Sequence, residues 1–194
     1  MPNRSKEAQS ASKNRQIDDD IPLNISGDLQ SLEEKDQAFL KILATDYRSF
    51  RFCLEKKRFS FRQNTIFLGP PQPNFALLTL HELGHGLCGH KDYHTHVERL
   101  KIESAAWQRA KTILKNYQKS AASLLQSPQK DIRNSGQALQ SVLPSWDQDF
   151  VEANLDTYRD WLHGKSRCRK CGLTCYQDAS GQYHCPFCDT FSSK

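Results

Sequence analysis

The sequence contains little that would place the chain in or across a membrane. Its 194 residues include no run of about 18 apolar residues, the length that a membrane helix needs, and no hydrophobic segment follows Met1. The sequence therefore predicts neither a membrane span nor a signal peptide. We expect a cytoplasmic protein without a membrane partner.

The number and spacing of the cysteines do not favour disulfides. The seven cysteines are odd in number, and four of them form two Cys-x-x-Cys pairs. This usage is typical of metal binding in a reducing compartment. Apolar residues make up 37% of the chain, enough for a modest core, and the net charge of +5 permits an anionic partner without indicating one.

The stretch His81-Glu82-Leu83-Gly84-His85 is the strongest functional signal. Two histidines four residues apart lie on one face of a helix, so both imidazoles can bind one Zn²⁺, and Glu82 between them is placed to act as a general base on water. Asn74 is the expected N-cap of this helix and Gly89 its stop. Its apolar face is formed by Ala76, Leu80, Leu83 and Leu87.

A second, long helix is predicted from about His94 to Leu125. Glu103 is the exception on its apolar stripe of Leu100, Trp107, Ala110 and Leu114. A carboxylate that faces a core is costly unless it meets a cation or a metal. We therefore predict Glu103 as the third metal ligand, with an arginine partner as the structural alternative. Other candidates for the third ligand are His90, His94 and His96.

The remaining pattern predicts a small sheet and two further helices. A helix is expected over about 32–50, and a hairpin that turns at Gln63-Asn64 over 59–68. Basic side chains between Arg51 and Arg62 indicate either a nucleic-acid face or, as we favour, a charged edge strand. Another helical stripe contains Val151, Leu155, Tyr158 and Leu162.

The C-terminal region predicts a second metal site. Cys168, Cys171, Cys185 and Cys188 form two knuckles that together can complete a tetrahedral zinc site with four thiolate ligands, with a hairpin over 176–183 between them. Cys175 and His184 lie within this zinc ribbon but outside the paired spacing, so we expect neither to bind zinc. The ribbon is only weakly basic once the thiolates are counted, so nucleic-acid binding has little support and a structural or protein-contact role is favoured.

The two helical motifs together resemble the ImmA/IrrE family of zinc metallopeptidases, which carry HELxH and then ExxA on the next helix. The resemblance covers roughly residues 30–120. It implies that His81, His85 and Glu103 bind a catalytic zinc and that Glu82 is the catalytic base. The chain has Trp107 where the family usually has Asn, and it adds a zinc ribbon.

The expected fold is α+β: a zincin-like minimal metallopeptidase domain, with helices and a small antiparallel sheet, followed by the four-cysteine zinc ribbon. The expected organisation is a disordered tail (1–27), the metallopeptidase domain (28–126), a linker (127–146), a helix (147–164) and the ribbon (165–194). The expected activity is hydrolysis of peptide bonds in an intracellular protein or peptide, with one catalytic and one structural Zn²⁺. Tyr93, His94 and His96 are candidates for the oxyanion donor.

Two other functions stay open at this point. SprT-like proteases, which act on DNA-bound proteins, also combine HExxH with a terminal ribbon, but they take a third histidine as ligand. A non-catalytic adaptor would instead close the first site with four protein ligands, for example His81, His85, His96 and Glu103.

Overall fold

The computed structural model describes residues 23–54, 57–188 and 191–192, and it has the α+β composition that the sequence predicts. The helices are α1 (Glu34–Asp46), α2 (Phe75–Leu87), α3 (His96–Leu125), α4 (Lys130–Val142) and α5 (Gln148–Ser166), with a short 3₁₀ turn, η1 (Leu29–Ser31). The strands are β1 (Ile25–Ser26), β2 (Arg51–Leu54), β3 (Ser60–Arg62), β4 (Thr65–Leu68), β5 (Tyr176–Gln177), β6 (Tyr183–His184) and β7 (Phe191–Ser192). Most of the predicted N-terminal tail lies outside the described residues, and its last part contains β1.

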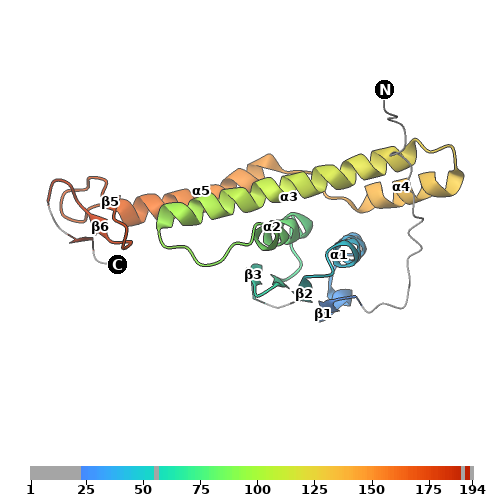
Figure 1. Cartoon of the computed structure of the whole chain (residues 1–194), viewed down its shortest axis with the longest axis horizontal. Coiled ribbons are helices and arrows are strands. Elements are labelled where there is room, and N and C mark those ends of the chain that lie inside the picture. The colour runs from blue at the N-terminus through green and yellow to red at the C-terminus, as the bar shows by residue number, and fades with distance from the viewer. Residues whose placement is uncertain (1–22, 55–56, 189–190, 193–194) are drawn as a thin grey trace, which may run out of the picture.

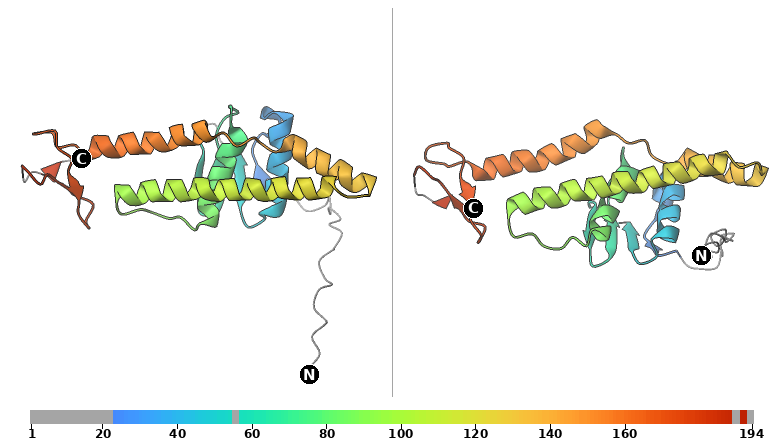
Figure 2. Two further views of the ribbon diagram at one scale, coloured as in Figure 1. Left: turned by 90° about the horizontal axis from the view of Figure 1, so that it is seen from above. Right: turned by 45° about the horizontal axis from the view of Figure 1, so that its top comes forward.

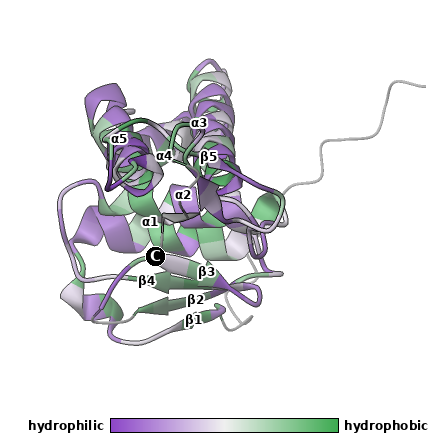
Figure 3. Cartoon of the chain, turned by 90° about the vertical axis from the view of Figure 1, so that its left-hand side faces the viewer, coloured by the Kyte–Doolittle hydropathy of each residue, from purple (hydrophilic) through white to green (hydrophobic). Residues whose placement is uncertain are grey.

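The elements form three layers, which Figure 3 shows end-on. The sheet β1–β4 is one outer layer, α1 and α2 cover it, and α3, α4 and α5 lie across them (Figure 1). Side chains of the sheet and of α2 meet in the core, where Phe52, Ile66, Leu68, Leu77 and Leu80 are fully buried. The ribbon lies at one end of the long helices, where α5 delivers the chain (Figure 2).

The four-stranded sheet is mixed, which corrects the prediction of an antiparallel sheet. The strand order is β1-β2-β4-β3; β1, β2 and β4 are parallel, and only β3 runs antiparallel to β4. The hairpin was predicted correctly, and its turn residues Gln63 and Asn64 both have positive φ. After β2 the chain passes to the far edge of the sheet, where it forms β3. The hairpin then places β4 between β2 and β3.

The stretch predicted as a linker, 127–146, contains helix α4. Its Gly136 lies so close to α3 that an added Cβ would be 2.9 Å from Leu124 Cβ and from the Leu125 amide. Leu139 and Leu143 contribute apolar surface to the core cluster. The stretch is rich in polar residues because only one narrow face of α4 packs against the core, and the rest of the helix surface faces solvent.

The two helices that carry the metal motifs approach each other closely. A Cβ on Gly84 would collide with the backbone carbonyl of Ala106, so only glycine permits this distance between α2 and α3. Asn74 precedes α2, as predicted, but it makes no side-chain cap; its backbone adopts φ 64°, which turns the chain into the helix. In the described part of the chain, no helix combines the length and apolarity that crossing a membrane requires.

Candidate metal centres

The structure brings together His81, His85 and Glu103, the first predicted set of ligands. Glu103 Oε2 lies 3.1 Å from His81 Nε2 and 3.3 Å from His85 Nε2, and the two Nε2 atoms are 3.1 Å apart. The residues come from α2 and α3, at the point where Gly84 permits close approach. His81 and Glu103 are buried, and His85 is half-buried.

The triangle of donor atoms has the size that zinc requires. Zn–N bonds of about 2.0–2.1 Å in a tetrahedron place neighbouring ligand atoms about 3.4 Å apart. The three observed separations, 3.1–3.3 Å, are close to this edge length. Nitrogen and carboxylate oxygen are also the donor types that Zn²⁺ takes at catalytic sites, so this group could hold a metal ion.

The protonation states of this group suit a cation. Burial lowers the pKa of His81, which favours the neutral imidazole that a metal ion requires, although the contact with Glu103 works in the opposite direction. Burial alone would raise the pKa of Glu103, but hydrogen bonds from His81 and His85 outweigh it and hold the pKa at about 2. Glu103 is therefore an anion that lies beside two imidazoles.

Groups behind the ligands fix the two imidazole rings by different means. His90 Nδ1 lies 3.0 Å from His85 Nδ1, on the side of the ring away from Glu103. The His81 ring stacks on Trp107, with centroids 4.3 Å apart and an angle of 27° between the planes. His81 Nδ1 is buried and has no hydrogen-bond partner among the described residues. Trp107 thus orients His81 by ring packing, where zinc-binding histidines usually use a hydrogen bond.

Glu82 lies beside the three ligands in a poorly solvated position. Burial is the largest cause that raises its pKa to about 7, and the charge of His85 and a hydrogen bond from the Phe61 backbone limit the rise. Phe61 belongs to β3, the edge strand. Arg62 and Thr65 flank the turn, and Phe61 and Ile66 form the next pair along the hairpin. In a two-residue hairpin such a residue directs its amide away from its partner strand, which explains how β3 reaches Glu82.

The other candidate ligands lie elsewhere. His94 is exposed. His96 Nδ1 lies 2.7 Å from the Tyr183 hydroxyl, and the His96 amide donates to Gln177 Oε1 at 2.9 Å, so this residue joins α3 to the ribbon. Tyr93 is 41% exposed and its hydroxyl accepts a hydrogen bond from Arg99.

Sequence reasoning missed the part that α5 plays at this site. Tyr158 was predicted only as a member of an apolar stripe, but burial and the charge of Glu103 raise its pKa to about 12. The ring lies under the guanidinium of Arg99, 5.1 Å from its centroid. Local sequence carries no signal for this contact, because it depends on how α5 folds back along α3.

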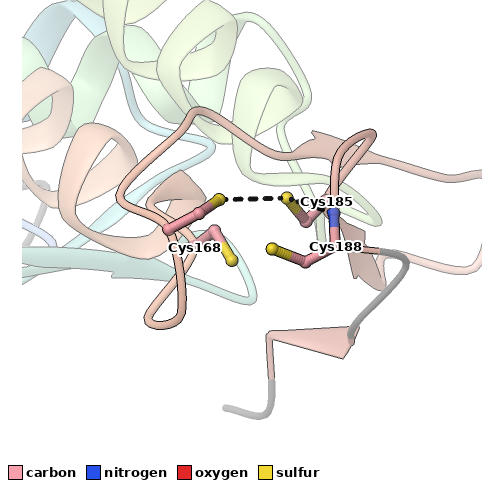
Figure 4. Close-up of side chains that lie close together, drawn as sticks. Cys168, Cys185 and Cys188 are labelled. Atoms are coloured by element: carbon pink, nitrogen blue, oxygen red, sulfur yellow. Dashed lines mark hydrogen bonds between the residues drawn. The ribbon is translucent and has the colours of Figure 1, made fainter.

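The second predicted site also forms. The sulfur atoms of Cys168, Cys171, Cys185 and Cys188 all lie within 4.8 Å of one another, and this group could hold a metal ion. Figure 4 shows the three labelled thiols directed toward a common centre. The Sγ atoms of Cys171 and Cys185 are 3.6 Å apart, near the edge of about 3.8 Å that Zn–S bonds of about 2.3 Å imply.

Local interactions separate these four thiols from the other candidates in the ribbon. Backbone amides of Cys171 and Lys170 lower the pKa of Cys168 to about 6, which favours its thiolate, whereas the contact with Cys171 raises the pKa of Cys188 to about 12. His184 Nε2 is held by Asp178 at 2.7 Å. Cys175 is buried in the small ribbon core beside the metal-site cysteines but is not one of the four converging thiols.

We found no protein family, no curated protein and no solved structure that matches this chain. The interpretation of both sites consequently depends on their own geometry.

Proposed function

We propose that this protein is a zinc-dependent metallopeptidase, similar in its site to the ImmA/IrrE family. The observation that carries the proposal is the arrangement of three converging donors, His81, His85 and Glu103, with the carboxyl group of a fourth residue, Glu82, near them. Three protein ligands leave one position of a tetrahedral ion for solvent, which is the pattern of catalytic zinc.

The alternative ligand sets receive less support from the same geometry. A closed structural site that uses His96 would need that ring at the metal, whereas His96 is bound to Tyr183 of the ribbon. A SprT-like site would need a histidine in place of Glu103. His90 contacts the far nitrogen of His85 instead.

Each residue of the site has a distinct task in the proposed reaction. When bound, Zn²⁺ polarises the scissile carbonyl and activates a water molecule. Glu82 accepts the proton of the attacking water and passes it to the leaving nitrogen. Its raised pKa suits a group that must take up a proton and release it near neutral pH.

The fold also offers a place for an extended peptide. β3 is an edge strand of the four-stranded sheet, and its Phe61 faces Glu82. An extended substrate that pairs with this edge would pass next to the general base, with main-chain hydrogen bonds providing affinity. The substrate class is accordingly an unfolded or loop segment of a protein.

The test is Glu82→Gln, assayed on a mixture of peptides by mass spectrometry. The variant should bind zinc as the wild type does and lose activity by about 10²- to 10⁴-fold, the usual contribution of a general base. Glu34→Gln, a change of the same kind at an exposed position of α1, is the control. Equal cleavage by wild type and Glu82→Gln, or no cleavage by the zinc-loaded wild type, contradicts the proposal.

A further inference from the structure

Helix α2 ends in a turn that ties His90 to the second histidine of the site. Gly89 has φ 66°, and its amide donates to the Gly86 carbonyl at 3.1 Å. The next amide, that of His90, donates to the His85 carbonyl, also at 3.1 Å. These two bonds define a Schellman motif, in which a glycine in the left-handed region reverses the chain at the end of a helix. His90 is thereby folded back onto the last turn of α2, where His85 lies.

The side chains of His85 and His90 meet across this turn. In Schellman motifs these two positions frequently hold apolar side chains that contact each other. Here both are imidazoles, with ring centroids 5.1 Å apart and an angle of 72° between the planes. His90 Nδ1 lies 3.0 Å from His85 Nδ1, which is a hydrogen-bond distance. On the opposite side of its ring, His85 directs Nε2 toward His81 Nε2 at 3.1 Å and Glu103 Oε2 at 3.3 Å.

This contact selects one tautomer for each ring. A hydrogen bond between two imidazole nitrogens needs one nitrogen with a proton and one without. His85 can bind a metal ion through Nε2 only if that atom has a free lone pair, so the proton of the neutral ring is on Nδ1. Nδ1 of His90 is then the acceptor, and the proton of His90 is on Nε2. The tautomer that this places on His85 is the one that an ion at the three donors requires.

The two histidine ligands differ in this respect. His81 Nδ1 is buried and has no hydrogen-bond partner among the described residues, and its ring packs on Trp107. His85 is less buried, and its Nδ1 faces a half-buried polar side chain. A polar partner behind a metal-binding imidazole fixes both its proton and its direction, whereas ring packing fixes only the direction.

From this geometry we infer that His90 is a positioning residue of the first metal site: its Nδ1 accepts a hydrogen bond from His85 Nδ1 and holds His85 with Nε2 directed at the ion. The inference rests on the metal site of the proposed function but not on the reaction. It extends the site beyond the two helices to the turn that ends α2. Without this acceptor the ligand remains present, but its tautomer and its ring orientation are no longer fixed.

The test compares three variants of the full-length, zinc-loaded protein: His90→Leu, His90→Asn and His94→Leu. Leucine keeps an apolar contact at the turn and removes the acceptor. Asparagine keeps an acceptor, because its Oδ1 is attached to Cγ, the same atom that carries Nδ1 in histidine. His94→Leu makes the first change again, at an exposed histidine of the following loop. The affinity of the first site for Zn²⁺ is measured by competition with a chelator.

His90→Leu should lower this affinity about 10- to 100-fold, the usual effect of a lost partner behind a metal ligand. In His90→Asn the affinity should stay within about threefold of the wild type, and in His94→Leu within about twofold. Undiminished affinity in His90→Leu overturns the inference. An equal loss in His90→Asn also overturns it, because the effect would then come from the size of the side chain and not from the acceptor.

Nitrogen NMR of the imidazoles gives a readout that packing alone would not change. With zinc bound, Nδ1 of His85 should carry a proton, and its signal should shift in His90→Leu but not in His94→Leu. A zinc ion bound at Nδ1 of His85, or at either nitrogen of His90, overturns the inference. A wild-type protein that binds zinc at the first site but cleaves no peptide contradicts the proposed function alone, since every measurement here is of metal binding.

Discussion

The two candidate metal centres of this chain are built on opposite principles. The His81–His85–Glu103 site lies where two long helices cross, over a core in which Leu77, Leu80 and Leu83 are fully buried. The cysteine site lies in a ribbon whose own core consists of Tyr183 and of cysteines themselves. In the first case the fold positions the ligands. In the second case the ligands are most of what holds the fold together.

This difference predicts that metal has separate effects at the two sites. Removing metal from the first site should abolish the proposed peptidase activity and leave the helices folded, since their packing does not depend on the metal. Removing metal from the ribbon should unfold the ribbon. Three variants test this contrast, from the largest expected effect to the smallest.

Cys185→Ser should unfold the ribbon while α1–α5 stay folded. The thiol is buried among the other ligands, and structural zinc contributes about 10–16 kcal/mol to domains of this kind. Limited proteolysis should cut within 167–188, and the protein should lose one of its two bound metal ions. Cys88→Ser, at an exposed thiol, is the control and should change neither the proteolysis pattern nor the metal content. Loss of both metal ions would show that the two centres are not independent.

Glu82→Gln should stabilise the metal-free protein at alkaline pH. Burial raises the pKa of Glu82 from 4.5 to about 7 in the folded state, so the folded protein loses stability as pH rises from 4.5 through 7. Glutamine has no charge to bury. Above pH 7 the free energy of unfolding of the variant should therefore exceed that of the wild type by about 3 kcal/mol. Urea unfolding at pH 8 and at pH 4.5 measures it. A gain of the same size at both pH values would mean that ionisation of Glu82 is not its source.

Gly84→Ala should separate α2 from α3. The added Cβ collides with the Ala106 carbonyl, and overpacking at such a contact costs about 1–3 kcal/mol. Zinc affinity of the first site should fall as well, because its ligands come from both helices. The control is Gly164→Ala in α5, where a Cβ meets nothing within 4 Å and helix propensity predicts a gain of about 0.5–1 kcal/mol. If Gly84→Ala and Gly164→Ala have the same free energy of unfolding, Gly84 is not the point at which α2 and α3 approach each other closely.

Sequence alone predicted the parts of the molecule that local pattern encodes. The spacing of His81 and His85, the lone carboxylate Glu103 on an apolar stripe and the two Cys-x-x-Cys pairs each depend on one helix or one knuckle, and the structure brings each group together. The parallel pairing of β2 with β4 was missed, because strand order depends on the path between strands. The contact of the Tyr158 ring with Arg99 was missed for the same reason, since it arises from long-range packing of α5 on α3.

The stack of Trp107 on His81 has a practical consequence. With ring centroids 4.3 Å apart, the indole is an optical probe in direct contact with an imidazole of the first candidate metal site. A change of charge on that imidazole, by protonation or by coordination, should alter the emission of the indole. Loading of the first site can therefore be followed by intrinsic fluorescence, without a dye, a label or knowledge of any substrate.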